Sequence, residues 1–425
     1  MSKRPANLLA GLDVGSNAIR LAVGQVMRHE NRGGNELQIL GAAETPSEGV
    51  SKGTIKSIED VVSSISACLE RVERLIGVPV DRVYLGVSGA HIISKNSKGF
   101  VAVSKADSEI SADDVRRAIE ASRSIATPLN YEVLHIFPRS YAVDDQVGIK
   151  DPIGMTGIRL EVETQIILGA AAQIKNLTTS VYRTGLDIEE MVLSIMAAAE
   201  AVLTHRQKDL GVVLVNIGGS TTSLAVFEEG NVLHTATLPI GSEHVTNDVA
   251  IGLRTSIDLA ERAKLEFGHA YSEVVPKKDE IDLTEIGAAE HELVKVKFLS
   301  DIIEARMEEI LHKVDQELKL VQRSGLLPAG VVFVGGGAKI PGLIDLAKKV
   351  LRLPASLGYP LDITSITEKS NDLSFATAIG LVKWGYDSMK RGSARPSFGP
   401  ALGGMGRNMG QAMGWFKKTI KDLIP

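Results

Sequence analysis

The chain contains the same strand–turn–strand unit twice, and this duplication constrains its fold more than any other feature. The first copy reads LLAGLDVGSNAIRLAVG from Leu8, and the second reads GVVLVNIGGSTTSLAVF from Gly211. In each copy two apolar, β-favouring runs flank a turn of small residues. The turn glycines Gly15 and Gly218 are 203 positions apart. We therefore expect two related α/β domains; two coincidental glycine turns are the alternative.

Both turns have the composition of an anion-binding loop. Glycine lets the backbone approach a ligand closely, so that its N–H groups can point at phosphate oxygens, and serine and threonine hydroxyls add donors. Two such turns predict a cleft in which a polyphosphate is held from both sides. Neither turn is a Walker motif, because no Gly-Lys-Ser/Thr follows. The predicted phosphate-binding residues are Gly15, Ser16, Asn17, Gly218, Gly219, Ser220, Thr221 and Thr222.

The composition excludes several classes of protein. The chain has 425 residues, enough for more than one sizeable core, with 44 % hydrophobic and 23 % charged residues, as in ordinary globular proteins. A net charge of −5 and an aromatic content of 4 % argue against a nucleic-acid partner. The single cysteine, Cys68, excludes an internal disulfide framework and fits a reducing compartment. No apolar run is long enough for a signal peptide or a transmembrane helix, so we expect any membrane contact to be peripheral.

Hydrophobic periodicity predicts an α/β alternation that is interrupted once. Apolar runs at 8–14, 19–26 and 37–43 predict strands, and the spacing over 57–76 predicts a helix. Residues 88–160 have a different texture, which predicts a small inserted α+β module. The predicted units are a first lobe (1–87, 161–206 and about 371–390), the inserted module (88–160), a second lobe (207–243 and 329–370), its subdomain (244–328), a Gly/Pro-rich flexible linker (391–411) and an amphipathic helix (412–425).

Four segments resemble the ATP-binding motifs of the actin/Hsp70/hexokinase superfamily. GLDVGSNAIRLAVG and VNIGGSTTSLAVF look like its two phosphate loops, and DLAERAKLEFG resembles the helix that supplies ribose and adenine contacts. On that helix Glu261 and Lys264 share one face, although on spacing alone a solvated face is the favoured interpretation. GVVFVGGGAKIPGL resembles the adenosine motif that passes under the base. The resemblance implies ATP and Mg²⁺ as cofactors and adenosine contacts from Glu261, Lys264, Gly335, Gly336, Gly337 and Ala338.

Within this superfamily the chain is similar to the FtsA family of bacterial cell-division proteins. The segments LHIFPRSYAVDDQ, GIKDPIGMTGIRLEVE, LSIMAAAEAVL and SDIIEARMEEI carry the resemblance, which covers about residues 8–424. It implies an actin-like two-lobed α/β ATPase fold with an FtsA-type α+β insertion. It also implies head-to-tail filaments on the cytoplasmic face of the membrane at the division site. The partners implied are FtsZ, further copies of the chain, anionic membrane lipids and later division proteins.

The second phosphate loop departs from the family pattern, which reads Asp-Ile-Gly-Gly-Gly-Thr-Thr-Asp. This chain has Asn216, Ser220 and Ser223 where that pattern has Asp, Gly and Asp. In the family pattern Asp13 would be the metal ligand. Asp13 and an acid at position 216 would together organise the hydrated Mg²⁺ and the attacking water. An asparagine can hold a water but brings no negative charge, and Mg²⁺ prefers carboxylates and water. Asp13 and Asn216 are therefore the catalytic candidates, and we expect ATP binding with slow or absent hydrolysis.

Two other functions are open on the same fold. The segment DVGSNAIRL also resembles the start of exopolyphosphatase and guanosine pentaphosphate phosphohydrolase enzymes. Such an enzyme needs a carboxylate base in the cleft, and the second loop has lost two of the family's acids, which weakens this interpretation. Such an enzyme also has no use for a membrane helix. The third interpretation is an actin-like pilus-assembly adaptor, against which the inserted module and the long tail argue.

The last segment, 412–425, has the pattern of a helix that lies on a membrane. At 100° per residue its large apolar side chains share one face, and three lysines occupy the other. As a helix it reaches roughly 20 Å, too short to cross a hydrocarbon core of about 30 Å. A helix docked on the protein's own core is the alternative, which the preceding linker disfavours. The predicted membrane-binding residues are Met413, Trp415, Phe416, Lys417, Lys418, Ile420, Lys421, Leu423 and Ile424.

Overall fold

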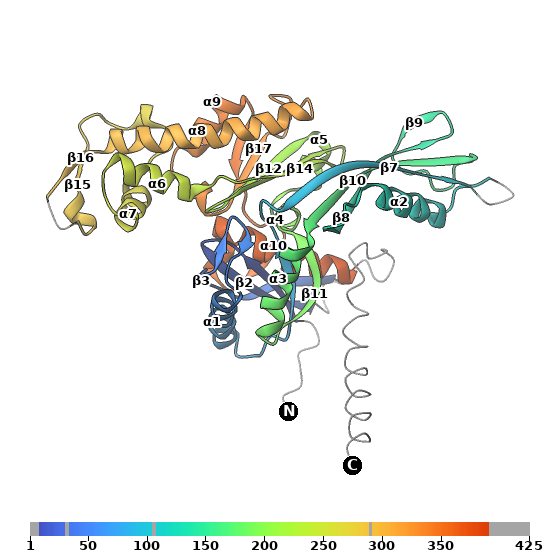
Figure 1. The fold of residues 1–425 in the computed structure, drawn as a ribbon, viewed down its shortest axis with the longest axis horizontal. Helices are drawn as coiled ribbons and strands as arrows, with labels where there is room; N and C mark the ends of the chain where they lie inside the picture. The colour runs from blue at the N-terminus through green and yellow to red at the C-terminus, as the bar shows by residue number, and fades with distance from the viewer. Residues whose placement is uncertain (1–7, 30–33, 104–107, 289–290, 391–425) are drawn as a thin grey trace, which may run out of the picture.

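The computed structural model describes residues 8–29, 34–103, 108–288 and 291–390 (Figure 1). The predicted linker 391–411 and the predicted membrane helix 412–425, with all nine of its membrane-binding candidates, lie outside the described residues. Within them the predicted α/β alternation is confirmed, and it builds two lobes with a further small sheet at one end of the molecule (Figure 1). The predicted unit boundaries remain predictions.

The first lobe is built on a six-stranded sheet in the order β11-β6-β1-β2-β3-β19. Strands β1, β2 and β3 form an antiparallel meander, and β6 lies parallel to β1. Residues alternate along β2, so that Leu21 and Val23 pack toward α1 and Ala22 packs toward α10. The strands are β1 (Leu8–Val14), β2 (Ala18–His29), β3 (Gly34–Pro46), β6 (Arg82–Val87), β11 (Asp187–Leu193) and β19 (Thr364–Ser365), with a small hairpin of β4 (Val50–Ser51) and β5 (Thr54–Ile55).

Helices cover both faces of this sheet. Helix α1 (Ile58–Ile76) confirms the helix predicted over 57–76: the Ser57 hydroxyl caps its first turn, and Gly77, in the left-handed region at φ 73°, ends it. Helix α3 (Ala171–Arg183) packs beside α1. On the other face α10 (Ala376–Lys390) crosses α4 (Ser194–Val202), and α4 also reaches β12 and β13 of the second lobe. The crossing of α4 and α10 therefore joins the two lobes.

The second lobe repeats the topology of the first. Its sheet has the order β14-β13-β12-β17-β18, with an antiparallel meander β12-β13-β14 and β17 parallel to β12. The same arrangement relates β1, β2, β3 and β6, so the duplicated sequence corresponds to a duplicated fold. The strands are β12 (Val212–Ile217), β13 (Thr222–Glu228), β14 (Asn231–Leu238), β17 (Val331–Val334) and β18 (Ala355–Leu357).

A helical layer extends the second lobe at the end opposite the small sheet (Figure 1). Its longest helix, α8, starts at Val296, and buried Leu299 lies on the apolar face in its first turn. The elements of this layer are α6 (Ser242–Gly252), α7 (Ile257–Phe267), α8 (Val296–Leu320), α9 (Leu343–Leu351), β15 (Glu280–Asp282) and β16 (Leu293–Lys295), with 3₁₀ turns at 272–274 and 283–286. Elsewhere, α5 (His205–Leu210) lies beside β13, and 3₁₀ turns at 336–339, 368–371 and 373–375 follow β17 or precede α10.

The small sheet has its own core. Four antiparallel strands in the order β7-β10-β8-β9 pack against α2, and buried aliphatic side chains such as Ile166 and Leu168 lie between them. Gly99 permits the contact, since a Cβ there would lie 2.0 Å from the Ala118 carbonyl oxygen on α2. The elements are β7 (Ile92–Ala102), α2 (Ala112–Ala126), β8 (Tyr131–Val143), β9 (Gln146–Ile149) and β10 (Arg159–Ala170).

The crossing of α4 and α10 gives a testable stability prediction. A Cβ on Gly380 would lie 2.0 Å from the backbone oxygen of Ala197. Alanine favours a helix over glycine by about 1 kcal/mol, but forced overpacking costs typically 1–3 kcal/mol. We expect Gly380→Ala to lower the thermal unfolding midpoint, whereas Gly336→Ala, with nothing within 4 Å of the added Cβ, leaves it near that of the unchanged protein. A Gly380→Ala midpoint equal to or above the unchanged value would contradict this packing.

Candidate functional site

The two glycine turns meet in a cavity between the lobes. The first turn joins β1 to β2 and the second joins β12 to β13, and a cavity of about 460 Å³ has both in its wall. The turns touch, since a Cβ on Gly219 would lie 1.7 Å from Oδ1 of Asn17. The predicted site residues that line the cavity are Asp13, Gly15, Ser16, Asn17, Asn216, Gly218, Gly219, Ser220, Thr221, Glu261, Lys264, Gly335, Gly336 and Gly337.

Two predicted residues do not line this cavity. Thr222 is fully buried at the start of β13, and its hydroxyl donates to the Ile240 carbonyl at 2.8 Å. That hydroxyl is therefore engaged within the lobe rather than turned to a ligand. Ala338 is also buried, and its N–H donates to the Gly335 carbonyl at 3.2 Å within the turn that follows β17. Both residues support the loops that line the cavity.

Two hydrogen bonds hold the first turn. The Gly15 N–H donates to the Ala18 carbonyl at 3.2 Å, and the Ser16 hydroxyl accepts from the Gly53 N–H at 3.1 Å. The Ser16 hydroxyl keeps its own proton to donate, because a hydroxyl carries one proton beside its acceptor lone pairs. The turn can therefore offer backbone and hydroxyl donors to an anion.

The second turn lies under the start of α6. The Gly218 N–H donates to the Thr221 carbonyl at 2.9 Å. The N–H groups of Ser242 and Glu243 donate to the carbonyls of Gly218 and Gly219, both at 2.9 Å. The Ser220 hydroxyl hydrogen-bonds the Glu243 carboxylate. Helix α6 therefore fixes the backbone of this turn from behind.

Asp13 is the half-buried acid that the first hairpin contributes to the cavity wall. It lies on β1 opposite Arg20 on β2, and burial raises the pKa of its carboxyl above the ordinary value. The Arg20 charge and a hydrogen bond with Ser194 act in the opposite direction on this pKa. Across the cavity, Nδ2 of Asn216 donates to the Thr377 hydroxyl at 3.3 Å. Among the described residues no group of three or more His, Cys, Asp or Glu could hold a metal, so a cation here would rest on Asp13 together with water and phosphate oxygens.

The far end of the cavity is lined by the residues predicted to contact adenosine. Glu261 and Lys264 on α7 pair at 2.6 Å in its wall, and Lys264 is only 4 % exposed. The turn after β17 faces them. Gly335 has φ 92°, which favours glycine, and a Cβ on Gly336 would meet nothing within 4 Å. Open space over Gly336 leaves room for a flat ring against the backbone.

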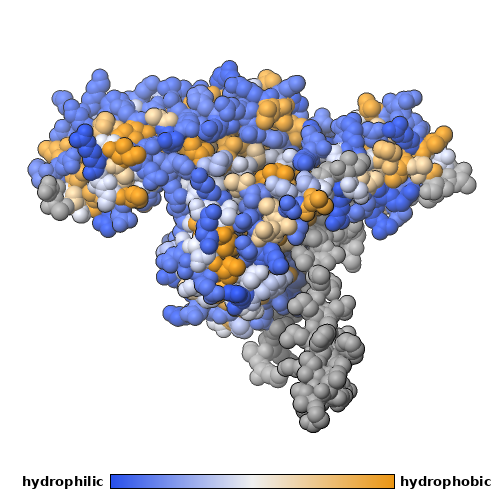
Figure 2. Space-filling model, in the orientation of Figure 1, coloured by the Kyte–Doolittle hydropathy of each residue, from blue (hydrophilic) through white to orange (hydrophobic). Residues whose placement is uncertain are grey.

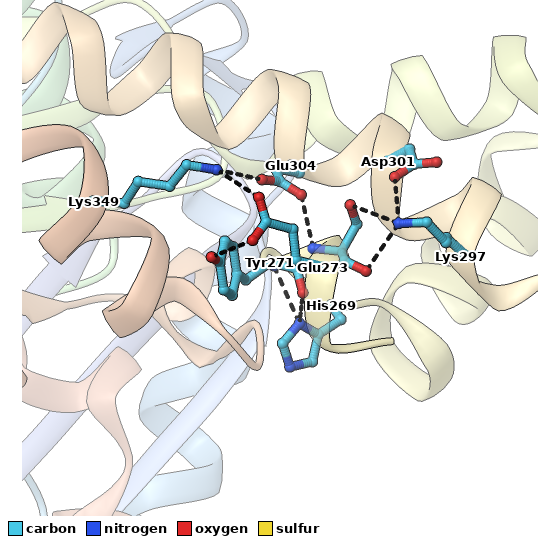
Figure 3. A network of polar contacts seen from close by, with 8 residues as sticks. His269, Tyr271, Glu273, Lys297, Asp301, Glu304 and Lys349 are labelled. Atoms are coloured by element: carbon cyan, nitrogen blue, oxygen red, sulfur yellow. Dashed lines mark hydrogen bonds and ion pairs between the residues drawn. The ribbon is translucent and has the colours of Figure 1, made fainter. Parts of the chain in front are cut away.

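A polar network joins the segment after α7 to α8 and α9 (Figure 3). The segment after α7 is tied to the turn after β17 by the Ala270 N–H, which donates to the Pro341 carbonyl at 2.7 Å. The Ser272 N–H donates to Glu304 on α8 at 2.7 Å, and Lys349 on α9 pairs with Glu273 at 3.2 Å (Figure 3). Helices α7, α8 and α9 are therefore held together at this end of the cavity.

The sequence prediction missed several lining residues. They are Arg20, Glu44, Ser88, Ser194, Ser242, Lys339, Ser374 and Thr377. Arg20 could have been predicted from the pairing of the two strands of the first hairpin, because it lies directly across from Asp13. Ser88 and Ser194 directly follow the carboxyl ends of β6 and β11, in a sheet where parallel neighbours end at the same edge as β1. A general rule places ligands at that edge, but which strands are neighbours depends on distant pairing.

The comparisons with known proteins agree with this architecture. The family model of the cell division protein FtsA matches residues 213–380, and that of the SHS2 domain inserted in FtsA matches residues 89–168. A cell division protein FtsA from Pseudomonas aeruginosa is 32 % identical over 92 % of this chain and 92 % of its own length. That from Bacillus subtilis is 36 % identical over 89 % of this chain and 83 % of its own length.

The chain belongs to the FtsA family of cell-division proteins.

Solved structures show that the fold of this FtsA-family chain is actin-like, as predicted. A PilM–PilN type IV pilus biogenesis complex matches with a TM-score of 0.65 at 17 % identity, covering 89 % of this chain and 98 % of the other. MreB5 of Spiroplasma citri bound to ADP matches with a TM-score of 0.53 at 12 % identity, covering 91 % and 98 %. At these identities the likeness concerns the fold. The family relatives favour the cell-division function over the phosphohydrolase and pilus alternatives.

The raised pKa of Asp13 gives a prediction with a defined pH dependence. Because burial raises the pKa of Asp13 in the folded protein, its ionised form destabilises the fold at neutral pH. We expect Asp13→Asn to raise the thermal unfolding midpoint at pH 7 without nucleotide or Mg²⁺. The gain should shrink as the pH falls through the raised pKa toward the ordinary value of 3.8, where the acid becomes protonated in both states. Asp145→Asn, at an exposed carboxyl, is the matched control, and an unchanged or lower midpoint for Asp13→Asn at pH 7 would contradict the burial effect.

Proposed function

We propose that this chain binds ATP between its lobes, polymerises on the cytoplasmic face of the membrane and tethers FtsZ filaments at the division site. The observation that carries the nucleotide part is the meeting of both glycine turns with the Glu261–Lys264 pair in one cavity. Its volume of about 460 Å³ falls in the usual range of small-molecule sites, about 300–1,000 Å³. The ADP bound to MreB5, a protein of the same fold, is consistent with this proposal.

Each part of ATP has residues that suit it. The two turns offer backbone and hydroxyl donors to the phosphates, and Glu261 and Lys264 offer an acceptor and a donor to the ribose and base. The space over Gly336 takes the ring. Asp13 suits a hydrated Mg²⁺, which would neutralise phosphate charge.

Turnover should be slow or absent. Asn216 stands where the family pattern has an acid, and its amide already donates to Thr377. It can position a water but cannot take a proton from it at neutral pH, since an amide is not a base. ATP would then act as an assembly cofactor that holds the two lobes in one arrangement.

Two exposed apolar patches suit a head-to-tail filament. One lies on α6, α7 and the segment after them, and the other lies on the β9 end of the small sheet (Figure 2). They occupy opposite ends of the molecule (Figure 1), and a heterologous contact between two different surfaces is what makes an open filament. The exposed residues are Ile251, Ile257, Leu265 and Val274 in the first patch and Phe100, Val147, Ile153 and Ile158 in the second.

The partners and the membrane attachment rest on the family and on the tail. No helix of the described residues is long and apolar enough to cross a membrane. The amphipathic segment 412–425 would bind anionic lipids from one side, and several tails on one filament would bind together. Segments 270–298 and 299–323 are the candidate FtsZ contacts by their family position, and the module around β7–β10 is the candidate contact for later division proteins.

Vesicle co-sedimentation with FtsZ tests the whole proposal. The full chain is compared with a chain ending at Gly410, on anionic vesicles, with and without Mg-ATP. We expect only the full chain to pellet with vesicles, to carry FtsZ with it, and to form filaments by negative stain that increase with ATP. Neutral vesicles should bind less, because the lysines of the tail then have no partner.

The outcomes separate the parts of the proposal. Equal pelleting of both chains with vesicles would show that the tail is not the membrane anchor. If neither chain binds vesicles or assembles, the tail is a docked helix. Binding of the full chain without FtsZ would remove the tethering role. Fast phosphate release in the same samples, above a no-protein control and abolished by Asp13→Ala, would contradict slow turnover.

A further inference from the structure

We propose that Thr246 is a positioning residue for the adenosine end of the nucleotide. Its hydroxyl holds the Glu261–Lys264 pair in the single arrangement that the cavity presents. The inference rests on the proposed function, because it assumes that ATP binds in the interlobe cavity. Thr246 belongs to none of the motifs that identify the cleft, and it lies behind the cavity wall rather than in it.

Three side chains form a closed set of hydrogen bonds. Nζ of Lys264 lies 2.6 Å from the Glu261 carboxylate and donates to Oγ1 of Thr246 at 2.9 Å. The Thr246 hydroxyl has one proton and two acceptors within reach, the same Glu261 carboxylate and, at 3.2 Å, the Ser242 carbonyl of its own helix. We assign the proton to the carboxylate, because a charged acceptor makes the stronger hydrogen bond. A hydroxyl can accept from an ammonium and donate to a carboxylate at once, which neither charged partner can do. Thr246 is therefore the member that fixes both others.

Burial makes this fixing effective. Thr246 and Lys264 are each only 4 % exposed, whereas the Glu261 side chain is 41 % exposed at the cavity. Lysine and glutamate are among the side chains that lose the most rotamer freedom when they are ordered. When a third group orders them in advance, a ligand does not have to supply that ordering on binding. Removing the hydroxyl should therefore weaken nucleoside binding without touching the nucleotide directly.

The position of Thr246 on α6 also provides a way to separate positioning from general support. The first turn of α6 holds the second phosphate turn through Ser242 and Glu243, and Thr246 follows one turn later. If Thr246 mainly supported α6, its loss would disturb phosphate binding as well. If it positions the pair, only the adenosine end should lose affinity. Inorganic tripolyphosphate has the phosphate chain of ATP but no adenosine, so it reports on phosphate binding alone.

The experiment measures ATP and inorganic tripolyphosphate binding by calorimetry in the presence of Mg²⁺. Thr246→Val keeps the shape and removes the hydroxyl, Thr246→Ala repeats the deletion, and Thr246→Ser restores the hydroxyl. Thr164→Val is the matched control, since Thr164 is equally buried and hydrogen-bonded to Ser97 and Ser122 in the small sheet. Unfolding midpoints establish that each variant is folded.

We expect Thr246→Val to weaken ATP about tenfold, the usual effect of losing a hydrogen bond to a charged group, and to leave tripolyphosphate within about twofold. Thr246→Ser and Thr164→Val should bind ATP like the unchanged protein. Equal losses for both ligands, unchanged ATP affinity in Thr246→Val, or a serine variant as weak as the valine one would each overturn the inference. If the unchanged protein binds no ATP, the proposed function itself fails, which is a distinguishable result.

Discussion

The contact between the two glycine turns is the constraint on which the rest of this structure depends. Gly219 has no side chain, and the Asn17 amide lies where a Cβ would be, 1.7 Å from that position. The lobes can therefore approach until both turns face one cavity. A side chain at position 219 would have to displace the Asn17 amide from the place where the two turns meet.

The packing around this contact consists of backbone approaching backbone. Gly241 lies against the carbonyls of the second turn, Gly335 lies against Ile217, and Gly380 lies against Ala197 where α10 crosses α4. Each close approach fixes the position of one element relative to the next, because a close-packed interior has no empty space into which either element could move. In this arrangement α6 connects the phosphate turn to the nucleoside pair, and the α4–α10 crossing connects the lobes.

The sequence predicted the parts of the site that depend on local order. The turns, the hairpins and the Glu261–Lys264 pair each depend on a few consecutive residues, and the structure brings them to one cavity. Sequence reasoning did not find Ser88 or Ser194, because they reach the cavity through parallel pairing of β6 with β1 and of β11 with β6. It also placed Thr222 among the phosphate ligands, although the turn ends one residue earlier and β13 directs that hydroxyl to Ile240. Which distant strands pair, and in which direction, depends on the packing of the whole sheet and cannot be predicted from the local sequence.

A structure of the full chain with Mg²⁺ and a non-hydrolysable ATP analogue tests the central claim most directly. The account predicts that the triphosphate lies between the turns at 15–17 and 218–221, with the base over Gly336 and the ribose beside Glu261. It also predicts that the metal is held by Asp13 and water. A nucleotide bound at any other place, or one whose phosphates contact a single turn, would contradict the claim that the duplicated hairpins form one clamp.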